Sequence, residues 1–148
     1  MKILKLTNST TELCIQEAVQ TLENGGLVIY PTETVYGIGV DATNENAVNK
    51  LLNYKGSREN KPFSIAVYGI DMASKYAIIN KTAENIYKNF LPGPITVVSE
   101  GKHILAAHVE SLKGTVGIRI PAHNLIIELV KKLNKPVTCT SAISVKGY

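Results

Sequence analysis

The chain has 148 residues, of which 45% are hydrophobic and 19% charged, and a formal net charge of +4. The length corresponds to about one domain of ~100–200 residues, and the composition excludes an intrinsically disordered protein. No apolar run approaches the ~20 residues of a transmembrane helix, and the first residues lack the apolar core of a signal peptide. The sequence therefore predicts one cytoplasmic domain over residues 1–148 with no membrane partner.

Positive charge is concentrated in the second half of the chain. Residues 1–74 carry six Lys or Arg against eight Asp or Glu, whereas residues 75–148 carry ten against four. The second half indicates an anionic partner such as a nucleotide or RNA, although a solvated lysine surface would give the same count. Arg58 and Arg119 are the two arginines of the chain, and the guanidinium fork grips phosphate or carboxylate in a way that lysine does not.

Predicted helices and strands alternate along the chain. The first helix begins at a capping box over residues 9–12, with Ser9 as N-cap, and ends at Gly25 and Gly26. Further helices are predicted after Thr43, over 71–77, over 82–90 and after Pro121, strands over 27–30, 63–68, 95–98, 115–120 and 137–140, and loops over 31–42 and 55–62. This alternation indicates a single α/β domain whose strands are buried by helices.

The segment 30–39 leaves a predicted strand with two threonine hydroxyls, a carboxylate, a phenol and two glycines. Loops at strand ends bind ligands in α/β folds, and glycine lets the backbone approach a ligand closely; a polar turn is the alternative. Residues 37–42 also fit G-x-G-x-x-A, the dinucleotide fingerprint. They neither follow the strand directly nor open a helix, which disfavours a Rossmann cofactor site.

Two other segments place cations where a ligand could bind. Lys55, Arg58 and Lys61 lie in one predicted loop, which suits a triphosphate but also suits a solvated loop. Arg119 stands in an otherwise apolar strand, so it needs an anionic partner if it faces the interior; otherwise it faces water. Hydroxyl residues over 138–141 offer further donors for phosphate or carboxylate oxygens.

The sequence contains no motif for covalent or metal chemistry. His103, His108 and His123 lack metal-ligand spacing with Cys, Asp or Glu, and His123 is interpreted as the start of a helix. Cys14 is assigned to packing, and no His or cation neighbours Cys139 in the sequence. We therefore assign no catalytic nucleophile, acid or base and no protein metal ligand.

Taken together, these segments resemble the YrdC/Sua5 family of threonylcarbamoyl-AMP synthases. The resemblance is carried by PTETVYGIG at 31–39, KG at 55–56 with KP at 61–62, LPGPIT at 91–96, GIRIP at 117–121 with His123, and TSA at 140–142. Their order and spacing agree with the family over nearly the whole chain. The first and third segments are specific to it.

The resemblance implies a fold, a reaction and a set of binding residues. The fold is a twisted mixed sheet with helices packed on it and a deep, positively charged cavity. The reaction joins L-threonine, bicarbonate and Mg·ATP into L-threonylcarbamoyladenylate and pyrophosphate. Threonine contacts are implied for Thr34, Arg119 and Cys139, the last through its backbone, and nucleotide contacts for Lys55, Arg58, Lys61, Thr115 and Ser141.

The implied product serves the t6A modification of tRNA. The implied macromolecular partners are therefore tRNA or double-stranded RNA and the other proteins of that pathway. Mg²⁺ is implied as the companion of the triphosphate, not as a metal held by side chains of this chain.

Three departures from the family pattern keep other functions open. Ser57 stands where the family's K-x-R motif has Arg, with Arg58 one position later, and Ile143 stands where the family's S-x-N motif has Asn. The chain also ends some tens of residues earlier than family domains. The alternatives are a related protein that hydrolyses or transfers a carbamoyl-adenylate, and a non-catalytic module that binds RNA or a nucleotide.

Overall fold

The computed structural model describes residues 1–56 and 61–143, which form six strands and five helices. The strands are β1 (Val28–Tyr30), β2 (Gly37–Gly39), β3 (Ser64–Ala66), β4 (Val97–Glu100), β5 (Thr115–Arg119) and β6 (Val137–Ser141). The helices are α1 (Thr11–Glu23), α2 (Glu45–Lys55), α3 (Ile70–Tyr76), α4 (Lys81–Phe90) and α5 (Asn124–Leu133). The α/β prediction is thus confirmed, and the deep basic cavity stays a prediction.

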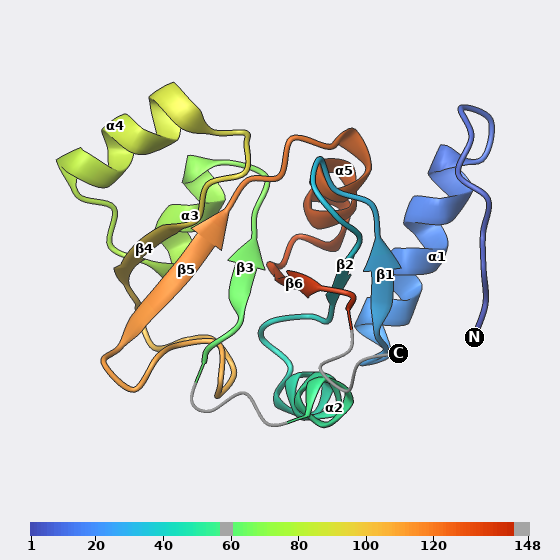
Figure 1. Ribbon diagram of the computed structural model, residues 1–148, viewed down its shortest axis with the longest axis horizontal. Coiled ribbons are helices and arrows are strands. Elements are labelled where there is room, and N and C mark those ends of the chain that lie inside the picture. Colours follow the sequence, from blue (N-terminus) through green and yellow to red (C-terminus); the bar gives the residue numbers. More distant parts are fainter. Residues whose placement is uncertain (57–60, 144–148) are drawn as a thin grey trace.

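The strands form one mixed sheet in the order β1-β2-β6-β3-β5-β4 (Figure 1). The pair β3–β5 is parallel, and the other neighbours are antiparallel. The order brings together segments far apart in the sequence, because β6 inserts between β2 and β3. In Figure 1, α3 and α5 lie behind the sheet and α2 lies below it.

The two faces of the sheet differ in burial. In β5, Val116 and Ile118 are fully buried, whereas the alternating residues Thr115, Gly117 and Arg119 are half-buried. Side chains alternate between faces along a strand, so one face is the apolar core and the other carries polar groups. The arginine in an apolar strand is thereby placed away from the core.

Three helices begin at a side-chain cap. The carboxamide of Asn44 accepts from Ala47 N–H at 3.1 Å to start α2, and Nδ1 of His123 accepts from Leu125 N–H at 3.3 Å to start α5. Such caps satisfy N–H groups that the helix itself leaves unpaired. The prediction that His123 starts a helix is confirmed.

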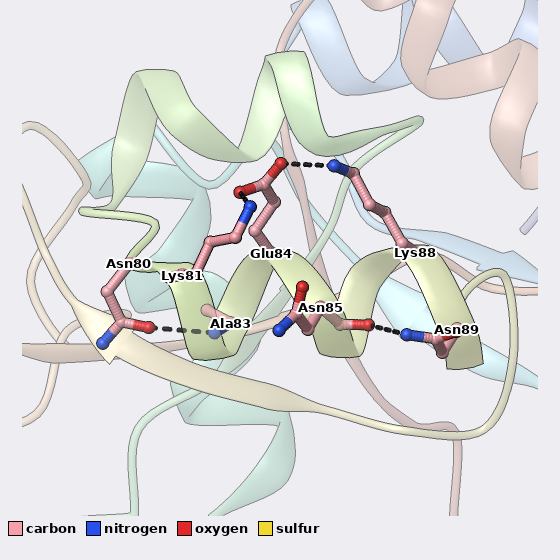
Figure 2. A network of polar contacts seen from close by, with 7 residues as sticks. All are labelled: Asn80, Lys81, Ala83, Glu84, Asn85, Lys88 and Asn89. Carbon is pink, nitrogen blue, oxygen red and sulfur yellow. Dashed lines mark hydrogen bonds and ion pairs between the residues drawn. The ribbon is translucent and has the colours of Figure 1, made fainter.

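The third capped helix, α4, is held by interactions within its own sequence (Figure 2). Asn80 accepts from Ala83 N–H at 2.9 Å, which caps the helix. Glu84 then pairs with Lys81 at 3.2 Å and with Lys88 one turn further along. These pairs lie at the i,i+3 and i,i+4 spacings where helix side chains meet.

Two local predictions were wrong. The N-cap of α1 is Thr10 rather than Ser9, and its side chain does not cap the helix: its oxygen accepts from Thr7 N–H at 2.9 Å and its hydroxyl donates to the carbonyl of Lys5 at 2.6 Å. The predicted loop 31–42 contains β2, whose middle residue Ile38 pairs with Ile29 of β1 and with Thr140 of β6. The predicted strand ends differ by at most two residues from those observed.

The glycines of β2 are explained by packing against neighbouring residues. A Cβ on Gly37 would lie 2.8 Å from the ring of Tyr30, and one on Gly39 would lie 2.2 Å from the carbonyl oxygen of Thr138. No larger residue fits at such a close approach. The glycines therefore do allow a close approach of the backbone, but the approaching groups are other residues of this protein rather than a ligand. The first three residues of the G-x-G-x-x-A segment form a strand and no helix begins there, which agrees with the argument against a Rossmann cofactor site.

Candidate functional site

Polar residues from three strands share one face of the sheet, which we call the polar face and define as Ser64, Thr115, Gly117, Arg119, Cys139 and Ser141. The register pairs Ser64 with Cys139 and Ala66 with Arg119, so these residues lie on the same side. A Cβ on Gly117 would lie 2.8 Å from Oγ of Ser64, which shows how closely the strands approach there. The polar face therefore brings together four predicted site residues that come from two separate segments of the chain.

Arg119 and Thr34 are two predicted threonine contacts. They meet where the C-terminal end of β5 lies against the loop after β1. The guanidinium donates through Nη2 to the carboxylate of Glu33, and the same nitrogen lies 3.5 Å from the hydroxyl of Thr34. The side chains of Arg119 and Glu33 are 16% and 18% exposed. The anionic partner expected for a shielded Arg119 is thus supplied by this chain.

The loop that carries Glu33 and Thr34 is fixed by the hydroxyl of Thr32. This hydroxyl donates to the carbonyl of Val35 at 2.6 Å and accepts from Thr34 N–H at 3.2 Å. Threonine hydroxyls stabilise turns by such local bonds. The first threonine of the motif therefore orders the loop, and the second reaches the guanidinium.

Glu33 is ionised at neutral pH. Partial burial by itself raises the pKa of the carboxyl group, but hydrogen bonds from Arg119 and from backbone amides, including that of Ala122, outweigh it and hold the pKa below its usual range. Arg119 also has a buried Nε with no hydrogen-bond partner among the described residues. The cluster is an ion pair whose guanidinium is not fully satisfied by its neighbours.

Cys139 lies beside this pair but is not activated as a nucleophile. Burial is the largest effect on its thiol and raises the pKa, although Tyr30 and Arg119 act in the opposite direction. The neighbouring hydroxyl of Tyr30 is itself fully shielded and donates to the carbonyl of Thr138 at 3.0 Å. A thiol with a raised pKa is neutral at pH 7 and weakly nucleophilic. The backbone contact implied for Cys139 stays a prediction.

Lys55, a predicted nucleotide contact, is 4% exposed and reaches the end of β6. Its ammonium group donates to the carbonyls of Ser141 at 2.9 Å and Ile143 at 2.6 Å. The side chain therefore joins the end of α2 to the segment that holds the predicted residue Ser141. Lys61 is exposed, and Arg58 lies outside the described residues. The nucleotide roles of these residues stay predictions.

Sequence reasoning missed two parts of this site. Glu33 was noted only as a carboxylate in a polar segment, because nothing local reveals a partner 86 residues away. Ser64 was predicted only as part of the strand over 63–68, although a polar residue near the start of that strand was the available signal. Long-range register, rather than composition, determines both positions.

Metal-binding groups are absent from the parts of the chain that the structure describes. No group of three or more His, Cys, Asp or Glu side chains there could hold an ion. A hollow of about 440 Å³ between α1 and α5 is lined by none of the predicted site residues. A second hollow, of about 280 Å³, lies beside β4 and α4, and Thr115 is the one predicted site residue in its lining. None of the described helices is both long and apolar enough to cross a membrane.

A family model of the Sua5, YciO and YrdC proteins, described as "Telomere recombination", matches residues 20–146. The chain belongs to this Sua5/YciO/YrdC family. Its sequence is 38% identical over 142 residues to a putative threonylcarbamoyl-AMP synthase of Methanocaldococcus jannaschii, covering 96% of this chain and 66% of that protein. The predicted resemblance is confirmed.

Solved structures support the same assignment. The fold matches Pyrococcus abyssi Sua5 complexed with L-threonine with a TM-score of 0.84 and 33% identity, covering 88% of this chain and 39% of that one. It also matches Escherichia coli YciO with a TM-score of 0.79 at 24% identity, over 88% of this chain and 63% of that one, which shows a shared fold. The chain thus spans less than half of the Sua5 chain and slightly less than two thirds of the other two proteins.

Proposed function

We propose that this protein is an L-threonylcarbamoyladenylate synthase. It would form L-threonylcarbamoyladenylate and pyrophosphate from L-threonine, bicarbonate and ATP, for t6A modification of tRNA. Family membership and the likeness to a Sua5 structure that holds L-threonine support the proposal. The single observation that carries it is the meeting of Arg119 with Thr34, since both belong to family motifs and come from segments 85 residues apart.

The proposed chemistry needs positioning and charge neutralisation more than a reactive side chain. The neutral amine of threonine attacks CO₂ with loss of a proton, or bicarbonate with loss of water. The resulting carbamate attacks the α-phosphorus of ATP in line and expels pyrophosphate. The thiol of Cys139, which lies beside Arg119, gives no support to a covalent intermediate, because burial raises its pKa. Mg²⁺ enters with ATP as part of the substrate.

Each predicted residue has a place in this proposal. Arg119 binds the carboxylate of threonine, Thr34 contacts the same substrate, and the backbone at Cys139 lies beside it. The nucleotide contacts are assigned to Lys55, Arg58, Lys61, Thr115 and Ser141. Lys55 supports this site in a second way, because it holds the carbonyl of Ser141 and thereby orders the end of β6.

A second candidate function is hydrolysis or transfer of a carbamoyl-adenylate. It is favoured by Ile143, whose exposed side chain cannot donate the hydrogen bond that the family's Asn offers. The fold shared with YciO shows that this scaffold also occurs outside the proteins named as synthases. A non-catalytic RNA-binding role remains the third candidate, based on the charge of residues 75–148.

The test is pyrophosphate release from Mg·ATP, with L-threonine and bicarbonate supplied together, singly and not at all. The adenylate product is identified by mass. We expect release only when both substrates are present, and an Arg119→Ala variant that is folded but inactive. Release that ignores threonine, or no release from folded protein, would overturn the synthase. Breakdown of added threonylcarbamoyladenylate would then favour the second candidate, and steeply salt-dependent RNA binding the third.

A further inference from the structure

Arg119 and Glu33 place two opposite charges side by side at one corner of the polar face. Their side chains are 16% and 18% exposed, so each is largely shielded yet still reaches solvent. The hydroxyl of Thr34 lies 3.5 Å from the same guanidinium nitrogen that Glu33 contacts. A cation, an anion and a hydroxyl are thus available to one small ligand.

The pair as a whole is neutral, and this limits what it attracts. A phosphate placed on Arg119 would face the ionised carboxylate of Glu33, and like charges so close repel. A free α-amino acid instead carries an ammonium and a carboxylate on one carbon atom. When such an amino acid binds, its carboxylate can pair with Arg119 and its ammonium with Glu33. These two pairs replace the internal one, so neither shielded charge is left without a partner.

We propose that Glu33 determines specificity by binding the α-ammonium group of the amino acid whose carboxylate is bound by Arg119. This inference rests on the proposed function and deepens it, because it makes the zwitterion, rather than threonine's carboxylate alone, the group that is recognised. The site then takes free α-amino acids and discriminates against hydroxy acids and amino-acid amides. The hydroxyl of Thr34 is adjacent, and its oxygen already lies 3.1 Å from the hydroxyl of Thr32 and 3.5 Å from the guanidinium, so a substrate side chain there would exchange one of these contacts for its own.

The charge state of Glu33 suits binding better than proton removal. Hydrogen bonds from Arg119 and from backbone amides outweigh partial burial and keep the pKa of this carboxyl low. A carboxylate with a low pKa is a weak base and a strong partner for a cation. Glu33 therefore holds the ammonium in place and leaves its proton to another acceptor.

The test measures binding by calorimetry to the whole protein, without ATP. The probes are L-threonine, 3-hydroxybutanoate, which lacks the ammonium, and L-threoninamide, which lacks the carboxylate. We expect the unaltered protein to bind L-threonine at least about tenfold more tightly than either analogue. In Glu33→Gln the affinity for L-threonine falls at least about tenfold, whereas that for 3-hydroxybutanoate stays the same or rises because Arg119 has lost its internal partner.

The matched control is Glu84→Gln, which removes another ion-paired glutamate, whose partners are Lys81 and Lys88 rather than Arg119, and leaves all three affinities unchanged. Equal losses for L-threonine and 3-hydroxybutanoate in Glu33→Gln would mean that Glu33 only positions Arg119, and would overturn the proposal. Equal binding of the two ligands by the unaltered protein, or no binding of L-threonine, would also overturn it.

Binding and pyrophosphate release, measured on the same protein, distinguish failure of this inference from failure of the proposed function. Ammonium-dependent binding of L-threonine without pyrophosphate release would leave Glu33 as the specificity residue and remove the synthase. Threonine-dependent pyrophosphate release with an unchanged KM for L-threonine in Glu33→Gln would keep the synthase and remove the role of Glu33.

Discussion

The ion-paired glutamates Glu84 and Glu33 differ in burial and in the sequence distance to their partners. Glu84 lies on α4 with Lys81 and Lys88, and the three side chains are 31%, 78% and 61% exposed (Figure 2). Glu33 pairs with Arg119 across 86 residues, and these two side chains are 18% and 16% exposed. The first cluster belongs to one helix, whereas the second joins a loop to the sheet.

This difference separates a local contact from one that defines a site. Exposed pairs within a helix are screened by water and contribute little to stability. A shielded pair costs desolvation, so removing one partner leaves the other charge without compensation. The long-range pair also offers both of its charges to a ligand. We therefore expect substitutions at the two clusters to have very different consequences.

The largest effect is expected for Arg119→Ala. It leaves the shielded carboxylate of Glu33 without its guanidinium, which costs about 2 kcal/mol of unfolding free energy, and it removes threonine-dependent pyrophosphate release. Urea unfolding and the release assay measure the two effects. A variant with native stability and native activity would show that the shielded pair behaves like the exposed one.

Breaking the pair between Asp41 and Lys135, of which only Asp41 is buried, is expected to have an intermediate effect on stability. Asp41 has a side chain 3% exposed and accepts from Lys135, 48% exposed, at 2.9 Å, while Thr43 donates two further bonds to it. Lys135→Met removes one charge-assisted bond and leaves the other two, so we expect a loss of about 1.5 kcal/mol in urea unfolding. A loss as large as that of Arg119→Ala would mean that carboxylate burial alone sets the cost.

Glu33→Gln is expected to give a smaller loss that depends on pH. The folded pKa of Glu33 lies below its unfolded value of about 4.3, so its ionised form stabilises the fold above that pH. We expect unfolding titrations to show a loss of about 1 kcal/mol at pH 7. The difference from the unaltered protein should shrink as pH falls below about 4.3 and disappear below the folded pKa. A difference that grows on acidification would contradict this sign.

The smallest effect is expected for Glu84→Gln on α4. Its side chain is 31% exposed and pairs only with exposed lysines, and Asn80 still caps the helix in the variant. We expect an unfolding midpoint and a threonine affinity that match those of the unaltered protein. A clear loss of stability would show that the α4 cluster supports the fold and would remove the contrast between the two regions.

The order of helices and strands could be predicted from the sequence because most of them have signals within their own residues. The apolar stripe of α5 and the stop at Leu91–Pro94 are visible within a few residues. β2 is not, because its glycines suggest a loop. They are required by the Tyr30 ring and the Thr138 carbonyl, which come from other strands. Local propensity cannot reveal such a constraint.

The candidate site could be predicted in part for the same reason. Arg119 was conspicuous in an apolar strand, and Thr34 lies in a specific motif, so both were named. The pairing of Arg119 with Glu33 depends on how the loop after β1 lies against the end of β5, which no short segment encodes. The bond from Lys55 to Ser141 likewise depends on where α2 meets β6.

The most direct test of this account is the location of bound L-threonine, measured by amide chemical shifts in ¹⁵N-labelled protein, whose 16.1 kDa suit the method. The account predicts that added L-threonine shifts amides over 32–36, 117–122 and 139–141 and leaves those lining the hollow between α1 and α5 unchanged. Shifts centred on Glu12 and Lys132, or none on the polar face, would contradict the assignment of the amino-acid site to Arg119 and its neighbours.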